Sequence, residues 1–312
     1  MKRILCCVLL AAMLFGLAAP ALADGGIPAP IETIPFDELP PVIDGQHHYL
    51  LLVCSGESWI YHPEAYTDGI MLVTLDTRAH RVMLTSFIRD AIVQKPDGKT
   101  FGRINGIVRR YSPEVMCQLL SEHIGVRIEK YLLFDLKQIA NIIDYLGGVE
   151  IEVNSSEASY LRRYPLSPTQ TKPSMNRAGT YLFNGRAAVI YMRIRKAGGG
   201  GDFMRTQRAR TVLSTLADKC REITYDQARA LVDSIMENTS KTNMNLDEMI
   251  SAMDQAYQLR GCTIEELRIP QDGDYHPFTL AGMATQELDW PACREAMNEY
   301  LQNSWLVMDD EE

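Results

Sequence analysis

Six basic side chains are concentrated between residues 193 and 210, in the stretch RIRKAGGGGDFMRTQRAR, where Asp202 is the only acidic residue. The whole chain has a formal net charge of -9 at pH 7, so this local excess of positive charge runs against the overall composition. Guanidinium groups match phosphate oxygens in a fork geometry and stay protonated in proteins. The stretch therefore predicts an anion site whose ligand is a phosphate or a pyrophosphate.

Arg205 has the most informative position, because it extends the apolar stripe of a helix predicted to begin near Phe203. The stripe residues recur at intervals of three and four and are Ala209, Val212, Leu213, Leu216, Ala217 and Cys220. A guanidinium on a core-facing stripe needs an internal partner or a ligand, and the N-terminus of a helix favours anions. We therefore expect Arg205 to face a buried anion, whereas Arg210 taken alone is expected to be an exposed charge paired with a carboxylate.

Three further arginines stand at the ends of predicted strands. Arg193 and Arg195 lie two residues apart in the run AAVIYMRIR, so a strand there places both side chains on one face. Arg89 ends another apolar run and is followed by Asp90, which we expect to orient Arg89 through an ion pair rather than to act as a base. Acidic residues are scarce nearby, so these arginines and Arg205 together predict a clamp for a pyrophosphate.

The elements that must position these side chains alternate between strand and helix patterns. Residues 47–56 form a continuous apolar run, and two β-branched runs at 70–75 and 81–88 are typical of a hairpin at the centre of a sheet. Further strands are predicted at 131–134, 149–153, 187–195 and 262–269, and helices at 113–124, 136–146, from 203 onward, within 225–257 and at 291–301. This alternation favours an α/β fold, a three-layer α-β-α sandwich with a central mixed β-sheet, in which residues 154–179 are irregular.

The composition divides the chain into four parts. The first 23 residues pair a positive start with an apolar run and the small-residue sequence ALA, which predicts a signal peptide cleaved after Ala23, or a membrane anchor where it stays uncut. The protein is therefore expected to be exported and to work at the extracytoplasmic face of the membrane or in the cell wall. The predicted parts are a signal segment at 1–23, an extended linker at 24–46, one domain at 47–303 and an acidic tail at 304–312.

Several function classes are excluded by charge and by the spacing of reactive residues. The acidic overall balance excludes nucleic acid as the partner, because binding a polyphosphate needs a basic surface. CSGES lacks the frame of a nucleophile elbow, and His47 and His48 are expected at the surface. The cysteines that follow the signal segment are Cys54, Cys117, Cys220, Cys262 and Cys293, and their spacing does not suit a zinc site. We expect them to be mostly buried thiols. The alternative is one disulfide that involves Cys262 or Cys293.

Four stretches, in this order, resemble the signatures of LytR-CpsA-Psr proteins. They are TDGIMLVTLDTRAHRVMLTSFIRD at 67–90, LGGVEIEV at 146–153, YLFNGRAAVIYMRIRK at 181–196 and GDFMRTQRAR at 201–210. The resemblance extends over residues 49–302 and implies a bacterial envelope phosphotransferase. Such an enzyme moves a glycan polymer, for instance a teichoic acid or a capsule chain, from a polyprenyl-pyrophosphate carrier onto peptidoglycan. It also implies an apolar tunnel for the lipid within the α/β core, arginines that hold the pyrophosphate and aspartates that hold Mg²⁺.

Carried over residue by residue, the resemblance assigns roles to the charged side chains. The implied catalytic residues are Arg89, Asp90, Arg193, Arg195 and Arg205. The implied pyrophosphate-binding residues are Arg89, Arg103, Arg193, Arg195, Arg205 and Arg208. Asp68 matches a metal-ligating aspartate, so the implied cofactor is Mg²⁺. The metal and the arginines would neutralise the pyrophosphate while a sugar hydroxyl attacks in line.

The chain departs from the family pattern at two positions near this site. Ser55 stands about where a second metal-binding aspartate is expected, and Tyr66 replaces an arginine. Magnesium is held by one or two carboxylates together with phosphate oxygens, so the loss of one aspartate weakens the site without abolishing it. The leading hypothesis is a transferase whose partners are a lipid-linked glycan, peptidoglycan and the membrane surface. The alternative is a relative that binds polyprenyl phosphates or wall glycans without turnover, and the signal segment opposes a third interpretation as a transcriptional regulator.

Overall fold

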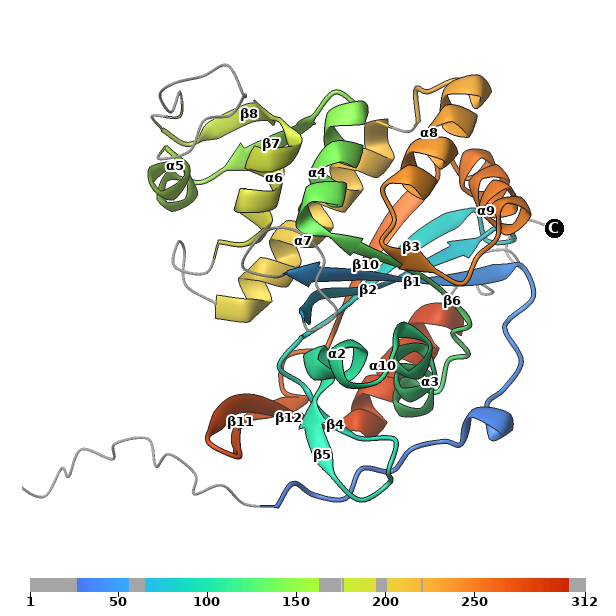
Figure 1. Cartoon of the computed structure of the whole chain (residues 1–312), viewed down its shortest axis with the longest axis vertical. Helices are drawn as coiled ribbons and strands as arrows, with labels where there is room; N and C mark the ends of the chain where they lie inside the picture. Colours follow the sequence, from blue (N-terminus) through green and yellow to red (C-terminus); the bar gives the residue numbers. More distant parts are fainter. Residues whose placement is uncertain are drawn as a thin grey trace, which may run out of the picture.

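A six-stranded mixed sheet forms the centre of the molecule in the computed structural model, which describes residues 27–55, 65–162, 175, 177–194, 201–219 and 221–302 (Figure 1). The strand order is β10-β3-β2-β1-β6-β9. The strands are β1 (Gln46–Ser55), β2 (Tyr66–Asp76), β3 (Arg81–Phe87), β6 (Lys130–Asp135), β9 (Lys241–Thr242) and β10 (Thr263–Ile269). β2 pairs antiparallel with β1 and β3, which confirms the predicted central hairpin, whereas β6 is parallel to β1 and β10 is parallel to β3.

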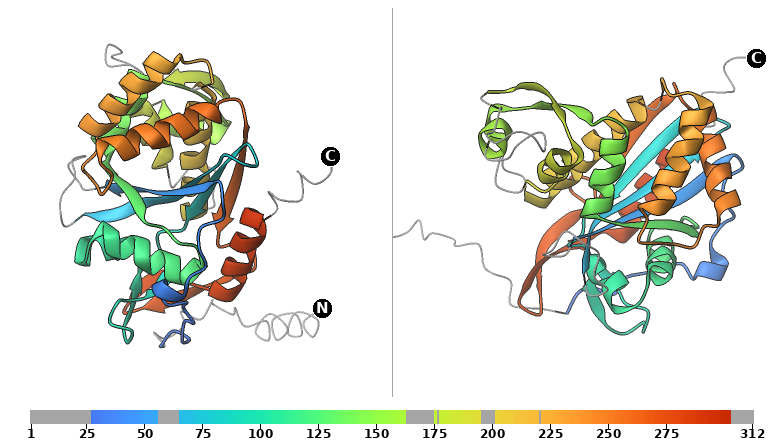
Figure 2. Two further views of the ribbon diagram at one scale, coloured as in Figure 1. Left: turned by 90° about the vertical axis from the view of Figure 1, so that its right-hand side faces the viewer. Right: turned by 45° about the horizontal axis from the view of Figure 1, so that its top comes forward.

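Helices cover both faces of this sheet (Figures 1 and 2). One layer contains α2 (Ile107–Arg110), α3 (Pro113–Ile124) and α10 (Trp290–Gln302). The opposite layer contains α4 (Leu136–Tyr145), α7 (Gly201–Lys219), α8 (Tyr225–Glu237) and α9 (Leu246–Gln258). The predicted α/β sandwich with a central mixed sheet is confirmed.

The two faces of β1 have different surroundings. Leu50, Leu52 and Cys54 are fully buried and belong to the core that includes residues of α3 and α10. Leu51 and Val53 point to the opposite face, as alternate residues of a strand must, and they are only half-buried. One face of the sheet is therefore closely packed, while the other borders a hollow.

Local sequence signals define the ends of α3 and α4. The Ser112 hydroxyl accepts a hydrogen bond from the Val115 N–H, and Gly125 ends α3 with a φ of 75°, a left-handed conformation that glycine adopts without strain. Asp135 closes β6 and also caps α4, because its carboxylate accepts from the Gln138 N–H in a capping box. The start and the stop predicted for α3 are confirmed.

Residues 185–192 form a helix, α6 (Gly185–Met192), so the strand predicted at 187–195 is wrong. Asn184 caps this helix by accepting from the Ala187 N–H. Gly185 packs so closely on α4 that an added Cβ would lie 1.9 Å from the Ala140 carbonyl oxygen. Because the helix is apolar on nearly every side, its sequence has no polar face to reveal a helical period, and a short apolar run of this kind is typical of a strand as well.

Smaller elements flank the sandwich, and among them the strand predicted at 149–153 is confirmed as β7. A second core gathers α5 (Ser155–Leu161), α6 and the two-stranded sheet of β7 (Val149–Val153) and β8 (Gly179–Phe183). Part of the segment expected to be irregular is therefore α5, which Asn154 and Glu157 cap reciprocally. Two hairpins complete the fold and consist of β4 (Ile92–Gln94) with β5 (Phe101–Arg103), and β11 (Tyr275–Leu280) with β12 (Met283–Leu288).

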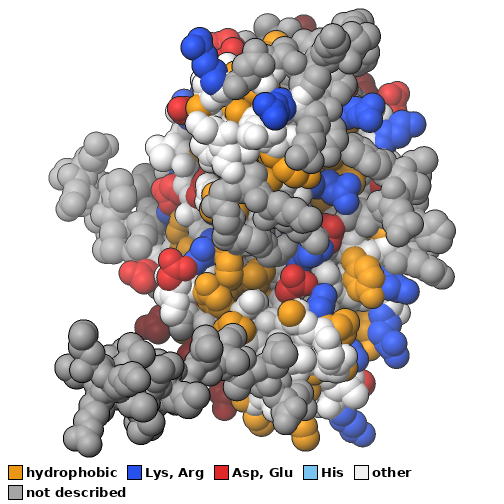
Figure 3. Space-filling model, turned by 90° about the vertical axis from the view of Figure 1, so that its left-hand side faces the viewer, with side chains coloured by type: hydrophobic (Ala, Val, Ile, Leu, Met, Phe, Trp, Pro, Cys, Tyr) orange, Lys and Arg blue, Asp and Glu red, His pale blue; other side chains and the backbone are white. Residues whose placement is uncertain are grey.

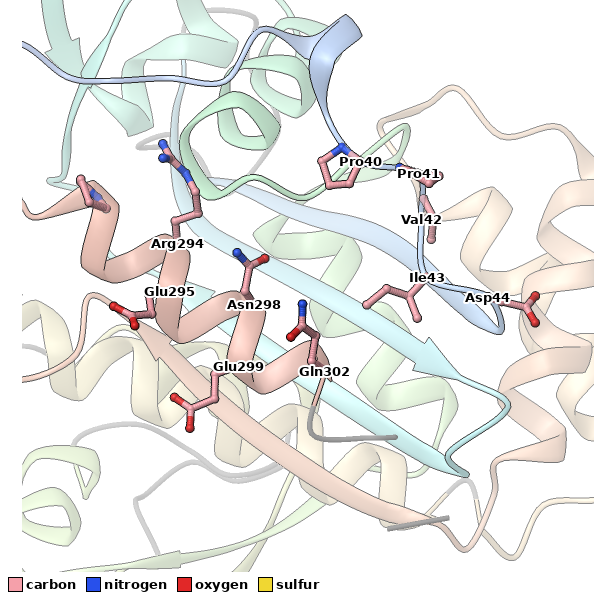
Figure 4. A pocket seen from close by; sticks show the side chains of 11 residues that line it. Pro40, Pro41, Val42, Ile43, Asp44, Arg294, Glu295, Asn298, Glu299 and Gln302 are labelled. Carbon is pink, nitrogen blue, oxygen red and sulfur yellow. The ribbon is translucent and has the colours of Figure 1, made fainter. Parts of the chain in front are cut away.

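The N-terminal arm, residues 27–45, runs along the layer of α3 and α10 (Figure 1). Arg127 fixes it by donating to the carbonyl oxygens of Phe36 and Leu39, where the arm forms the short 3-10 helix η1 (Phe36–Glu38). A groove of about 1300 Å³ separates the end of the arm from α10 (Figure 4). Its lining includes one arginine, Arg294, and three acidic residues, so it is not suited to an anion.

Two expectations about isolated side chains have different outcomes. Cys54, Cys117 and Cys293 are buried free thiols and Cys262 is a partly exposed one, while Cys220 lies outside the described residues. His48 is 8% exposed rather than at the surface, because β1 is a central strand covered on both faces. Burial lowers the pKa of His48 to about 4, and its Nδ1 lies 2.8 Å from the Thr74 hydroxyl. Within the described ranges, the helices are too short or too polar to cross a bilayer.

Candidate functional site

A β-bulge places Asp68 near the start of β2, an interior strand of the central sheet. Val53 pairs with Gly69 and the next residue, Cys54, pairs with Thr67, so Asp68 is the extra residue of β2. A bulge of this kind leaves one residue out of the ladder and changes the direction of its side chain, which is why bulges recur beside active sites. Because the Asp68 carbonyl is outside the regular pairing with β1, it is available to a side-chain donor.

Two arginines from distant parts of the chain converge on Asp68. Arg89, two residues after the end of β3, donates from Nη1 to Asp68 Oδ1 at 2.6 Å. Arg205, in the first turns of α7, donates from Nη2 to the Asp68 carbonyl oxygen at 2.9 Å and places Nη1 3.7 Å from Oδ1. The side chains are between 6% and 19% exposed, so these charges lie mostly out of water. The expected position of Arg205 on a core-facing stripe is confirmed.

A second carboxylate continues the cluster toward α2. Asp90 Oδ2 lies 3.5 Å from Arg89 Nε, and Asp90 Oδ1 lies 3.3 Å from Arg103 Nη1. The ion pair expected between Arg89 and Asp90 is therefore present. Asn105 belongs to the same corner, since its N–H donates to the Arg89 carbonyl at 3.2 Å and its side chain is 3% exposed. The sequence analysis missed Asn105, and its only signal was a polar residue inside the apolar run INGIV.

Arg193 reaches the site from α6 rather than from a strand. It follows the last turn of the helix, where its N–H caps the carbonyl groups of Val189 and Ile190. Its side chain lines the same cavity as Asp68 and Arg205. Arg195 lies outside the described residues, and so does the side chain of Ser55, whose backbone ends β1 opposite Tyr66.

The cavity behind this cluster has a volume of about 450 Å³ and lies between the sheet and one helix layer. Strands β1 and β2 form one wall, and α4, α7, α8 and α9 form the others. Its charged lining residues are Asp68, Arg193 and Arg205, while the rest of the described lining is mostly aliphatic and methionine-rich. Figure 3 shows the side on which β1 ends and α7 begins, where basic, acidic and hydrophobic side chains lie next to one another.

Several apolar residues of this interior are only half-buried, which distinguishes the cavity from an ordinary core. Leu51, Val73, Leu213 and Leu231 are each partly accessible although each faces the middle of the molecule. Close packing normally eliminates such space, because voids forfeit dispersion contacts and leave apolar surface unburied. An elongated apolar ligand that filled the cavity would restore those contacts.

Arg208 and Arg210 are internal ion-pair residues. Arg208, predicted as a pyrophosphate ligand, is 1% exposed and donates from Nε to Glu157 Oε1 at 2.7 Å and from Nη1 to the Ile194 carbonyl at 2.8 Å. Arg210, expected at the surface, is 5% exposed and donates to Glu266 and to the Ser86 hydroxyl. The exposed position expected of Arg210 is wrong, although its expected carboxylate partner is present, and Arg208 is buried against a carboxylate of α5. Adjacent elements cover these faces of α7 and supply partners for the two guanidinium groups.

The site favours a doubly charged anion over nucleophilic catalysis. Three guanidinium groups, from Arg89, Arg103 and Arg205, contact the carboxylates of Asp68 and Asp90, and the Arg193 side chain lines the adjacent apolar cavity. Guanidinium groups gathered in this way are the residues that bind phosphate oxygens. Cys54 is the nearest thiol described, but burial raises its pKa to about 11, so it stays protonated at neutral pH and is a poor nucleophile.

The donor set also fits a magnesium ion of the kind that binds together with phosphates. Asp68 offers a hard carboxylate oxygen at the cavity lining, and Mg²⁺ in such sites takes one or two carboxylates plus phosphate oxygens. No group of three or more histidine, cysteine, aspartate or glutamate side chains capable of holding a metal occurs among the described residues. An ion here would therefore depend on the ligand's own oxygens.

Two curated proteins are similar to parts of this chain. Biofilm regulatory protein A of Streptococcus mutans is 22% identical over 193 residues, which are 59% of this chain and 46% of that protein. The polyisoprenyl-teichoic acid--peptidoglycan teichoic acid transferase TagV of Bacillus subtilis is 27% identical over 199 residues, which are 61% of this chain and 48% of that protein. The chain spans about half the length of these curated relatives.

A solved structure and a family model extend the similarity to most of the chain. The structure of TagT bound to LI-WTA superposes with a TM-score of 0.66 at 21% identity, covering 89% of this chain and 98% of that chain, which shows a shared fold. The model of the LytR_cpsA_psr family matches residues 52–299. These residues include most of the sheet and of the cavity walls and every described member of the arginine and aspartate cluster, and the chain belongs to the LytR_cpsA_psr family.

Proposed function

We propose that this protein is an exported phosphotransferase that moves a glycan polymer from a polyprenyl-pyrophosphate carrier to peptidoglycan. The observation that carries the proposal is the cavity of about 450 Å³, which is apolar along its walls and lined by Asp68, Arg193 and Arg205 as its charged residues. An amphiphile with a long hydrocarbon tail and a compact anionic head matches both parts. Two similar proteins support this substrate class, since TagV is named as a teichoic acid transferase and TagT was solved with LI-WTA bound.

The lipid tail and the head group would contribute to binding in different ways. Each methylene group moved from water into the cavity contributes about 0.8 kcal/mol, so the tail supplies most of the affinity. The arginines position the pyrophosphate, because Arg89 and Arg205 are held by the same Asp68 oxygen and converge on one point. In this proposal the pyrophosphate would bind at the charged lining of the cavity, and the glycan would extend away from the apolar walls.

The transfer would break the bond between the two phosphates. A hydroxyl oxygen of the acceptor sugar attacks the phosphorus that carries the glycan, and polyprenyl phosphate leaves with the bridging oxygen and its electron pair. The acceptor proton passes to solvent or to a phosphate oxygen, so the total charge is conserved in the step. Arg89 and Arg205 would stabilise the charge that develops on the leaving phosphate, and Asp90 would hold Arg89 in place through its 3.5 Å contact. Magnesium bound at Asp68 would add further neutralisation of the phosphate oxygens.

Removing single arginines is expected to weaken binding of the pyrophosphate lipid. Arg89→Ala and Arg193→Ala should each cost about 1.5 to 3 kcal/mol, the usual value for a hydrogen bond to a charged group. The dissociation constant of polyprenyl pyrophosphate for the purified chain measures this effect. Arg186→Ala is the matched control, since Arg186 is an exposed arginine on α6 whose removal should leave affinity unchanged. Unchanged affinity in both site variants would contradict the clamp.

A relative that binds without turnover is the second candidate function. The observation that favours it is the set of contacts on Asp68, whose carboxylate already faces Arg89 and Arg205 and has no second carboxylate beside it among the described lining residues. A metal with so few protein ligands depends strongly on the substrate. Binding of the lipid-linked glycan with no transfer would identify this case.

One assay separates these two functions. Labelled polyprenyl-pyrophosphoryl oligosaccharide is incubated with the purified chain and peptidoglycan fragments, in Mg²⁺ and in EDTA, and binding is measured in parallel. Metal-dependent transfer is the result expected of the phosphotransferase. Binding without transfer supports the second candidate, and the absence of both contradicts the proposed substrate class.

Export is part of the proposal and has its own measurement. The apolar run in the first 23 residues followed by ALA supports a signal peptide cleaved after Ala23. The intact mass of the protein recovered from the envelope fraction should then correspond to a chain beginning at Asp24. Recovery of the protein from the cytoplasm alone would contradict export.

A further inference from the structure

An exposed tyrosine and an exposed arginine form a platform beside the candidate site. Tyr66, the first residue of β2, is 46% exposed, although large aromatic side chains are usually buried. The guanidinium carbon of Arg109 lies 4.8 Å from the centre of the Tyr66 ring. We call this pair the Tyr66–Arg109 platform, and it contributes to none of the contacts that hold Asp68 or Asp90 described above.

A continuous chain of contacts places the platform at the edge of the anion site. Asp68 is joined to Asp90 through Arg89, and Asp90 is joined to Arg103, which immediately precedes η2 (Ile104–Gly106) and α2. Arg109 belongs to α2, and its guanidinium lies over the ring of Tyr66, which stands two residues before Asp68 in the sequence. Two residues of extended chain span roughly 7 Å, so the backbone of Tyr66 lies within about one sugar unit of the backbone of Asp68.

Two neighbours of the tyrosine ring come from the segment of η2 and α2. Gly106, the last residue of η2, lies near one edge of the ring, because a Cβ added to this glycine would lie 3.8 Å from the ring atom Cε1. Arg109 is exposed, and it lies in the last turn of α2 beside a second exposed arginine, Arg110. The platform is therefore an accessible aromatic surface beside two exposed arginines.

The geometry points to a binding subsite for the pyranose ring of a glycan, formed by Tyr66 and Arg109 at the exit of the pyrophosphate site. The axial C–H groups of a pyranose make one ring face apolar, and a tyrosine ring offers a rigid apolar surface with a polar tip. A guanidinium beside the ring binds hydroxyl, phosphate or carboxylate oxygens of the same sugar. This inference rests on the proposed function, because the phosphate position defines which side of Asp68 the sugar occupies.

Two sugars fit this description, the first sugar of the lipid-linked donor and the sugar of the peptidoglycan acceptor. Both sugars must approach the same phosphorus, so the same aromatic ring and guanidinium could bind either of them. Three probes distinguish them: polyprenyl pyrophosphate without a sugar, polyprenyl-pyrophosphoryl disaccharide, and a soluble peptidoglycan disaccharide-peptide. Each is titrated against the full chain and against its variants.

Tyr66→Ala is expected to weaken binding of at least one sugar-bearing probe by roughly tenfold, about the value of one aromatic stacking contact, and to leave binding of the sugar-free lipid unchanged. Tyr66→Phe keeps the ring and should retain the affinity. Tyr145→Ala removes an equally exposed tyrosine from the end of α4 and should change nothing. Loss with the peptidoglycan probe assigns the acceptor to the platform, and loss with the disaccharide lipid alone assigns the donor.

Two results would overturn the subsite. Equal weakening of the two pyrophosphate-lipid probes in Tyr66→Ala, with the peptidoglycan probe unaffected, would show that the ring only supports the anion site. Unchanged binding of both sugar-bearing probes would show that the ring contacts no sugar. Failure of the unmodified chain to bind the sugar-free lipid would instead contradict the proposed function. In that case the peptidoglycan probe still decides the subsite, because it contains neither the pyrophosphate nor the lipid.

Discussion

Replacing Asp68 with asparagine is expected to reduce glycan transfer by roughly a hundredfold to a thousandfold, the range found when one preorganised electrostatic group is removed from an active site. Asparagine keeps the size of the side chain but removes the charge that Arg89 contacts at 2.6 Å and Arg205 at 3.7 Å. It also removes the carboxylate proposed to hold Mg²⁺. Transfer of labelled oligosaccharide to peptidoglycan fragments measures the effect.

Binding and transfer should separate in this variant. The two guanidinium groups remain, so the affinity for sugar-free polyprenyl pyrophosphate should stay close to that of the unmodified chain or increase. Asp90→Asn is the matched control, because the contacts of the Asp90 carboxylate described above are with guanidinium groups, at 3.3 and 3.5 Å, and its loss should reduce transfer by roughly tenfold. Equal rates of transfer by Asp68→Asn and by the unmodified chain would show that the Asp68 carboxylate is not needed for catalysis.

The second large effect is on stability and concerns the buried ion pair of Arg208 and Glu157. Arg208→Met is expected to lower the free energy of unfolding by about 3 to 5 kcal/mol, because it leaves the Glu157 carboxylate buried without its charge partner. The two side chains are 1% and 6% exposed, so water cannot replace the lost contact. Denaturant unfolding of the purified chain, followed by circular dichroism, measures the change.

A double variant tests whether the loss comes from the unpaired charge. Arg208→Met combined with Glu157→Met removes both charges and should recover much of the stability, since an apolar pair of similar volume often replaces a buried ion pair without loss. Glu157 also caps α5 by accepting from the Asn154 N–H, so full recovery is not expected. A double variant as unstable as Arg208→Met would mean that packing rather than charge determines the effect.

The difference between Arg205 and Arg208 shows that helix periodicity does not by itself predict which neighbour a buried arginine contacts. Both lie on α7 and both were predicted to meet the pyrophosphate, yet only Arg205 reaches Asp68. Three residues advance a helix by less than one full turn, so the two side chains diverge toward different neighbours. The partner of Arg208 is on α5, in a segment whose sequence showed no regular pattern, and nothing local could identify it.

Much of the framework follows from the sequence alone. The apolar runs of β1, β2 and β3 predict adjacent buried strands, because continuous apolar runs bounded by turn residues are typical of strands buried on both faces. Ser112, Gly125 and Gly147 mark helix ends through the chemistry of capping and the left-handed backbone of glycine. The position of Arg205 on an apolar stripe also predicts a buried guanidinium, since its neighbours determine which side of the helix faces inward.

Only the tertiary structure decided which charges meet and where the interior stays open. The bulge at Asp68 arises from pairing between β1 and β2, and α6 is a helix because Asn184 caps it and Gly185 allows contact with α4. The cavity has no local signal, because the same apolar residues would fill a core if the helices packed closer to the sheet. Sequence specifies which faces avoid water, whereas the distance between those faces depends on contacts made by the whole chain.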